Sequence, residues 1–176
     1  MNQFSMTSAL FVRHAVSQIA VALTFVVALV SAPVRAQGVS PKSKTTADES
    51  SRSAAKLIQP EELARIVQSP KGDRPLIFQV GYRVLYQQAH VPHSEYIGPA
   101  SEPEGIQRLR QRVQGLPRTQ SIVIYCGCCP WSKCPNINPT YKELRALEFR
   151  NIKLLYTADN FGKDWVDKGY LVEKGE

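Results

Sequence analysis

All four cysteines of the chain lie within nine residues, at Cys126, Cys128, Cys129 and Cys134. The run 122–125 before them is short, β-branched and apolar, which predicts a buried strand that ends at Cys126. A loop rich in proline and glycine follows. Asn138 and Pro139 then predict the start of an amphipathic helix, because Asn is a good N-cap and Pro suits the first helical position.

This order of strand, cysteine loop and helix favours chemistry at Cys126. In open α/β sheets, ligands bind beyond the carboxyl ends of the strands. Backbone N–H groups and a helix N-terminus at that edge favour an anion. A thiol placed there loses its proton more easily, and the thiolate is the form that attacks. We therefore predict that Cys126 is a nucleophile, with a buried structural cysteine as the alternative.

The other three cysteines indicate a site rather than a folding framework. Cysteines that stabilise a fold as disulfides are usually spread along the chain, where they close long loops. Here the four thiols are crowded, and the vicinal pair Cys128 and Cys129 is poorly placed to bridge to itself.

Residues 1–36 match a secretory signal peptide. They contain Arg13 and His14, an apolar run at 19–30, and a small-x-Ala pattern ending at Ala36. The twelve residues of the apolar run are fewer than the roughly 20 needed to cross a bilayer. We expect an exported protein, periplasmic or secreted, with cleavage after Ala36 and no stable membrane insertion afterwards. In such a compartment thiols tend to be oxidised or bound to metal.

The remaining chain predicts a linker and one domain. Residues 37–55 are rich in Ser, Lys, Thr and Asp, which is typical of disorder. In residues 56–176 strands alternate with helices, which predicts an α/β domain with a central parallel sheet of about five strands and helices on both faces. The formal net charge of +7 is scattered along the chain. No dense basic tract is interleaved with aromatic residues, so no nucleic-acid partner is predicted.

Three shorter segments carry local predictions. Residues 82–89 predict a short helix with Leu85 facing inward. Residues 101–104 match a capping box at the start of a helix. Residues 160–169 predict a short helix that Gly169 ends.

Over about residues 57–173, this arrangement resembles the rhodanese family of sulfurtransferases. The cysteine at the end of the 122–125 strand is the most specific point of likeness. Residues 89–94 resemble the family's Gly-His-Ile-Pro-Gly-Ala turn, and residues 147–155 its Gly-Phe-x-Asn-Val strand. Residues 76–81 stand where the family has a strand ending in Asp-Val-Arg, with Gln79 in place of the Asp and Gly81 in place of the Arg.

The resemblance implies a persulfide enzyme that needs no cofactor. Cys126 would take a sulfane sulfur from a donor such as thiosulfate and pass it to an acceptor such as cyanide or a thiol. The implied partners are a small sulfur-containing anion and a thiol acceptor. The implied substrate-binding loop contains Gly127, Trp131, Ser132 and Lys133.

The loop is longer than the family's and brings extra thiols. One of Cys128, Cys129 and Cys134 could resolve the Cys126 persulfide, releasing reduced sulfur as a disulfide forms. By the same resemblance, His90 would be a structural residue that hydrogen-bonds backbone at its turn. No role is assigned to His93.

Two alternatives stay open. The first is a soft-metal protein that binds copper or zinc through Cys126, Cys128, Cys129 and Cys134. The second is a thiol–disulfide redox protein working through Cys129 and Cys134, or a binding module on the same scaffold. The sequence makes no prediction of the oligomeric state.

Overall fold

The computed structural model describes residues 55–70, 72 and 74–175. The predicted signal peptide at 1–36 and the predicted linker at 37–54 lie outside these residues. Ala55, the last residue of that linker, is partly buried against the core. In the part of the chain that the structure describes, no helix is both long and apolar enough to cross a membrane.

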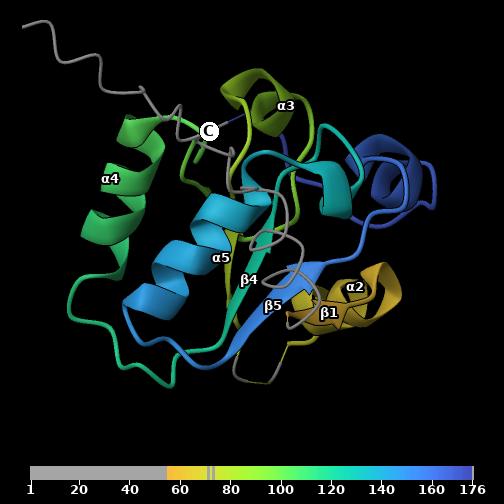
Figure 1. Ribbon diagram of the computed structural model, residues 1–176. Helices are drawn as coiled ribbons and strands as arrows, with labels where there is room; N and C mark the ends of the chain where they lie inside the picture. The colour runs from red at the N-terminus through yellow and green to blue at the C-terminus, as the bar shows by residue number, and fades with distance from the viewer. Residues whose placement is uncertain (1–54, 71, 73, 176) are drawn as a thin grey trace, which may run out of the picture. The chain divides into compact units, whose positions relative to one another are not determined.

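Five short parallel strands form the central sheet, in the order β1-β5-β4-β2-β3 (Figure 1). The strands are β1 Lys56–Ile58, β2 Leu76–Gln79, β3 Ser94–Tyr96, β4 Ile122–Tyr125 and β5 Ile152–Leu155. All four residues of the central strand β4 are buried, as expected for a parallel strand covered on both faces. The predicted α/β fold class is confirmed.

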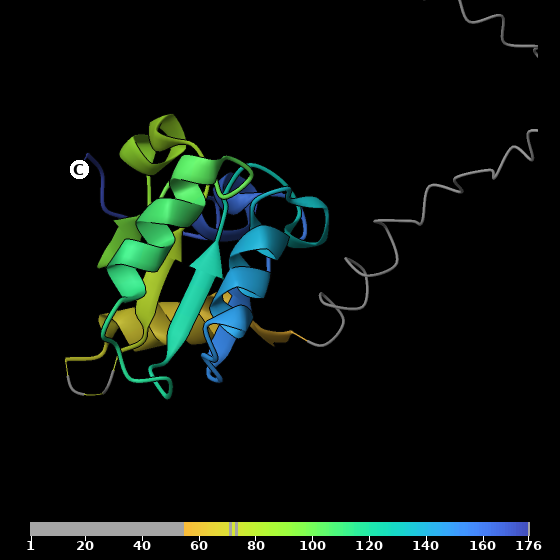
Figure 2. The same cartoon turned by 60° about the vertical axis from the view of Figure 1, so that its left-hand side comes forward.

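Helices cover both faces of the sheet. They are α2 Pro60–Gln68, α3 Arg83–Gln88, α4 Pro103–Val113 and α5 Ile137–Ala146, with a short 3₁₀ helix η1 at Trp131–Lys133 and a π-helical turn η2 at Gly162–Val166. Successive residues of a strand face opposite sides. Accordingly, Ile122 and Ile124 pack with α4 and α5, while Val123 and Tyr125 pack with α2 and η2. Figure 2 shows α4 and α5 side by side in front of β4.

The strand ends set the position of the cysteine loop. In the register of β2 and β4, Gln79 lies opposite Tyr125. The residue after Tyr125 is Cys126, so the thiol sits at the carboxyl edge of the sheet beside the end of β2. The sequence predicted this position for Cys126, at the carboxyl end of its strand.

Two local predictions are wrong. In α3 the buried residue is Tyr86 rather than Leu85, because the Tyr86 hydroxyl donates to Ser94 O at 2.5 Å and its ring stacks on His90. The capping box at 101–104 does not form. Pro103 starts α4, no side chain caps it, and the Ser101 N–H donates to Asn136 Oδ1 instead.

The start of α5 also differs from its prediction. Asn136, not Asn138, occupies the N-cap position, and Asn138 is buried in the first turn. Pro139 is tolerated inside that turn because the first N–H groups of a helix have no intrahelical partner. The predicted helix at 160–169 is the π-helical turn η2, and the turn after it does end at Gly169, which has φ of 75°.

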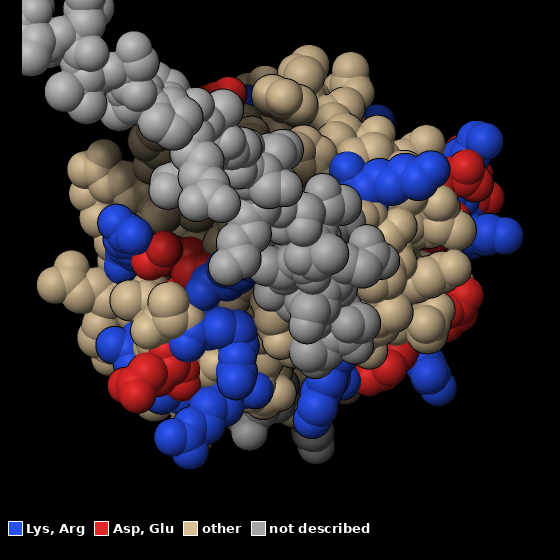
Figure 3. All heavy atoms as spheres, viewed as in Figure 1, with Lys and Arg blue, Asp and Glu red and all other residues tan. Residues whose placement is uncertain are grey.

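Acidic and basic side chains are interspersed on the face seen in Figure 3. On α4, for example, Arg110 pairs with Glu143 and Arg112 pairs with Glu95. Such pairs balance charge locally and leave the net charge unchanged. The expected absence of a nucleic-acid partner stays a prediction.

Candidate functional site

The four cysteines lie together at the carboxyl end of β4. Cys126 and Cys134 are buried, Cys129 is half-buried and Cys128 is exposed. The Sγ atoms of Cys126 and Cys128 are 3.3 Å apart, and those of Cys128 and Cys129 are 3.1 Å apart. No disulfide joins any of the four. The structure therefore brings all four predicted site cysteines into one cluster.

Three of these sulfurs also have the spacing of a metal-ligand group. The Sγ atoms of Cys126, Cys128 and Cys134 all lie within 4.8 Å of one another. Three thiolates around one ion at about 2.3 Å would be about 4.0 Å apart. A soft ion such as Cu(I) therefore fits the cluster with small side-chain adjustments.

The sulfur of Cys126 is surrounded by hydrogen-bond donors. The side-chain amide of Asn136 lies with Nδ2 3.4 Å from Cys126 Sγ. Asn136 is fully buried, and its Oδ1 accepts the backbone N–H of Ser101 at 2.9 Å. Because an amide oxygen cannot donate, this contact turns the NH₂ group toward the sulfur.

These donors make Cys126 the thiolate of the cluster. The Cys134 thiol, the Asn136 amide and the backbone N–H of Cys128 together lower the pKa of the Cys126 thiol to about 6, although burial opposes them. The pKa of the Cys134 thiol is raised, mainly because it donates its proton toward Cys126. Burial and its neighbouring thiols raise the pKa of Cys128. One negative charge at neutral pH therefore resides on Cys126, as a nucleophile requires.

Gln79 and Gly81 hold the backbone of Cys126. The Gln79 side chain donates from Nε2 to Cys126 O at 2.8 Å, and its Oε1 accepts the Gly81 N–H at 3.1 Å. A Cβ atom on Gly81 would lie 2.5 Å from Cys126 O and 3.0 Å from Cys126 Sγ. The sequence singled out these two residues only as departures from the rhodanese pattern. Their contacts give them a positioning role.

The rest of the predicted substrate loop divides into two parts. Gly127, at φ of 97°, turns the chain, and its carbonyl accepts the Phe161 N–H at 3.2 Å. Trp131, Ser132 and Lys133 form η1, whose Trp131 N–H donates to Thr157 O, two residues after β5, at 3.1 Å. Trp131 packs partly against the core, and Lys133 is exposed.

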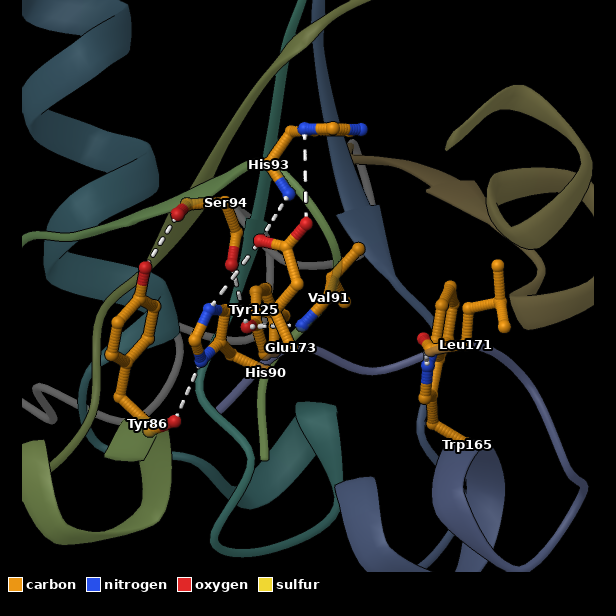
Figure 4. A network of polar contacts seen from close by, with 9 residues as sticks. All are labelled: Tyr86, His90, Val91, His93, Ser94, Tyr125, Trp165, Leu171 and Glu173. Atoms are coloured by element: carbon orange, nitrogen blue, oxygen red, sulfur yellow. Dashed lines mark hydrogen bonds and ion pairs between the residues drawn. The ribbon is translucent and has the colours of Figure 1, made fainter. Parts of the chain in front are cut away.

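A polar network supports the strand end below Cys126 (Figure 4). The buried Tyr125 hydroxyl accepts the Val91 N–H and hydrogen-bonds Ser94 Oγ, both at 3.1 Å. His90 donates from Nδ1 to Tyr86 O at 2.7 Å, which confirms its predicted backbone contact. His93 is exposed beside Glu173, 3.9 Å between the nearest charged atoms. Burial raises the pKa of Tyr125, so its phenol stays neutral and serves as core.

Sequence reasoning missed Asn136 as a functional residue. It stands between the last cysteine and the helix, and the sequence predicted the helix start two residues later, at Asn138. Its role depends on Ser101, 35 residues away, and on Cys126. Its place two residues after Cys134 was the one signal available in the sequence.

Comparisons with known proteins agree with this fold. No protein-family model matches the chain, and no curated protein matches it. The solved rhodanese-like domain of the Alr3790 protein from Anabaena is 17% identical, with a TM-score of 0.50, covering 68% of this chain and 79% of that chain. The BH2092 protein from Bacillus halodurans is 17% identical, with a TM-score of 0.53, covering 70% and 80%.

A third similar structure is the protein RPA3614 from Rhodopseudomonas palustris, described as a protein of unknown function and possible tyrosine phosphatase. It is 12% identical, with a TM-score of 0.52, covering 72% of this chain and 90% of that chain. At these identities the likeness concerns the fold. The domain thus has a rhodanese-like fold, as the sequence predicted.

The first prediction concerns ionisation. The reduced protein should show a thiolate that forms as the pH rises through about 6, because the donors around Cys126 lower its pKa. Ultraviolet absorbance of the thiolate against pH measures this step, and Cys126→Ser should lack it. Asn136→Asp keeps the acceptor for Ser101 but replaces the donor with a negative charge, so it should raise the pKa. A wild-type step near 8.5, the ordinary cysteine value, would contradict the assignment.

The second prediction concerns Gly81. Gly81→Ala should destabilise the fold by about 1–3 kcal/mol, because its Cβ overlaps backbone that cannot move freely. Gly162→Ala is the matched control, since its Cβ would meet only the flexible Asn160 side chain at 3.0 Å. Denaturant unfolding compares the two variants. Equal stabilities would show that the Gly81 contact with Cys126 is not restrictive.

Proposed function

We propose that this rhodanese-like domain is a sulfurtransferase that carries sulfane sulfur as a persulfide on Cys126. The observation that carries the proposal is the buried Cys126 sulfur at the carboxyl end of β4, hydrogen-bonded by Asn136 and flanked by two further thiols. The rhodanese-like fold supports it. A thiolate stabilised by several hydrogen-bond donors is suited to attack an electrophilic sulfur.

The reaction needs two displacements. Cys126 Sγ attacks the outer sulfur of the donor, whose remainder leaves with the electron pair, and Cys126–S–S⁻ forms. A thiolate or cyanide then attacks the outer sulfur, and Cys126 leaves as thiolate. The Asn136 amide and the Cys128 N–H, which face the sulfur in the resting protein, stabilise the negative charge before and after transfer. No cofactor is required.

A neighbouring thiol provides a second reaction by which the persulfide can release its sulfur. Cys128, 3.3 Å from Cys126, or Cys134, which donates to it, can attack the inner sulfur of the persulfide. A disulfide then forms and hydrogen sulfide leaves. The two cysteines supply both electrons, so an external thiol must reduce the disulfide before the next turnover.

Phosphate transfer, suggested by the description of RPA3614, is less well supported. A phosphoryl dianion is usually bound by arginine through paired hydrogen bonds. The loop between Cys126 and Asn136 contains no arginine, and its single cation, Lys133, is exposed. An uncharged or singly charged sulfur compound suits this loop better.

Export is part of the proposal. The signal-peptide pattern of residues 1–36 supports transport out of the cytoplasm, to the periplasm or beyond. The mature N-terminus would then be Gln37. A thiolate that is almost fully buried suits an oxidising compartment, because burial limits its contact with oxidants.

The third prediction tests the persulfide. Treatment of the reduced wild type with an organic persulfide should add about 32 Da, removable by reduction and located on Cys126 by peptide mapping. Cys126→Ser should lower sulfur transfer to cyanide by about 100-fold or more while the circular dichroism spectrum stays native. Undiminished transfer by this variant would rule out Cys126 as the carrier.

A second candidate function is the binding of a soft metal. The mutual 4.8 Å limit on the Cys126, Cys128 and Cys134 sulfurs favours it. The fourth prediction is that, if metal binding is the function, the protein purified anaerobically holds about one copper per chain. Each of the substitutions Cys126→Ser, Cys128→Ser and Cys134→Ser would then release the copper. Elemental analysis without copper or zinc excludes this function.

A further inference from the structure

A cavity of about 360 Å³ adjoins the cysteine loop. Its wall is formed by the end of β2, the helix α3, the end of β4, the first loop residues and the segment 160–167. The volume lies in the range of small-molecule sites. The cavity therefore has room for an organic molecule larger than an inorganic anion.

Cys128, and not Cys126, lines this cavity. Among the four cysteines only Cys128 contributes to the wall, next to Gly127. Cys126 is 3% exposed, and its sulfur is turned toward Asn136 at the start of α5. The Sγ of Cys128 nevertheless lies 3.3 Å from that of Cys126. A molecule in the cavity thus meets Cys128 first, and the thiolate stands directly behind it.

The wall is unsuited to an anion. Leu85, Phe161 and Val166 give it apolar side chains, while Gln88 and Asn160 add amides. Its one carboxylate is Asp167, and no lysine or arginine belongs to it. An anion would meet no cation in this wall and would be repelled by Asp167. An uncharged molecule with an apolar body buries its surface favourably.

We propose that this cavity binds an organic persulfide, R–S–S–H with an uncharged, apolar R group, and that Cys128 relays its outer sulfur to Cys126. This inference rests on the proposed persulfide function and names its donor class. Cys128 is then a catalytic residue in direct contact with the substrate.

The relay balances without an oxidant or reductant. The Cys126 thiolate, 3.3 Å away, takes the proton of the Cys128 thiol, and Cys128 Sγ bonds to the outer sulfur as the bond from that sulfur to R–S breaks. The R–S⁻ group takes the proton from Cys126 and leaves as R–SH, which restores the Cys126 thiolate. Cys126 thiolate then attacks the same sulfur on Cys128–S–S–H. The Cys128–sulfur bond breaks, and the persulfide proton passes to Cys128. The products are Cys126–S–S⁻ and a restored Cys128 thiol, so one sulfane sulfur has moved and the cluster keeps its single charge.

Two probes of similar size test the donor class. The R group of benzyl persulfide is uncharged and apolar, whereas the R group of thioglycolate persulfide carries a carboxylate. We expect benzyl persulfide to load Cys126 of the full chain at least about tenfold faster, because the wall gives the carboxylate no cation and places Asp167 near it. The readout is the initial rate of the gain of about 32 Da on Cys126. Equal rates for the two probes would overturn the proposed donor class.

Two variants test the route. Cys128→Ser keeps a hydrogen-bond donor for the Cys126 thiolate but cannot carry sulfur, and Val166→Trp fills the cavity from its partly exposed wall. Each should slow loading from benzyl persulfide about tenfold or more. Val84→Trp, on an exposed α3 residue outside the wall, is the matched control and should load normally. The thiolate titration of Cys128→Ser confirms that Cys126 still ionises.

The outcomes separate the two proposals. If wild type, Cys128→Ser and Val166→Trp all load Cys126 at one rate, the relay and the cavity assignment are wrong, while the persulfide function stands. If the wild type takes up no sulfur on Cys126 from thiosulfate or from either persulfide, both proposals fail.

Discussion

A negative charge on the buried sulfur of Cys126 is the constraint on which the rest of the site depends. A buried charge without a paired cation is stable only where hydrogen-bond donors replace water. The donors here come from separate segments: Asn136 before α5, the Cys128 N–H in the loop and the Cys134 thiol. Asn136 is in turn oriented by Ser101, before α4. The packing of α4 and α5 on one face of the sheet therefore fixes the electrostatics of the thiol.

Much of the fold could be predicted because its signals are local. The β-branched run of β4 and the apolar spacing of the helices each describe one element, and their alternation implies the parallel sheet. The errors arose where distant atoms decide. Tyr86 is buried in preference to Leu85 because Ser94 and His90 supply its partners. Asn138 looked like the N-cap because no local pattern shows that the chain already turns at Asn136.

The candidate site was predictable to a smaller extent. Cys126 could be singled out because a strand end, a loop and a helix start follow one another in the sequence. Gln79 could not, since its partner is the Cys126 carbonyl, 47 residues along the chain. Gly81 is glycine because the neighbouring strand brings Cys126 within 3.0 Å of where its Cβ would be. Where the rhodanese pattern has Asp and Arg, this chain has a neutral amide at Gln79 and a glycine at Gly81.

The spacing Cys-Gly-Cys places a buried thiol, Cys126, next to an exposed one, Cys128. A thiolate at 3% exposure is protected from oxidants, but the same burial keeps a bulky substrate away from it. Gly127 adopts a φ of 97°, which residues other than glycine rarely adopt. This turn allows the Cys128 side chain to reach the cavity, while Cys128 Sγ stays 3.3 Å from Cys126 Sγ. A reactive sulfur can then remain buried and still exchange with a molecule outside, provided that a second thiol stands between them. In the proposed relay, the exposed Cys128 and the buried Cys126 thus act in succession on the same sulfur atom.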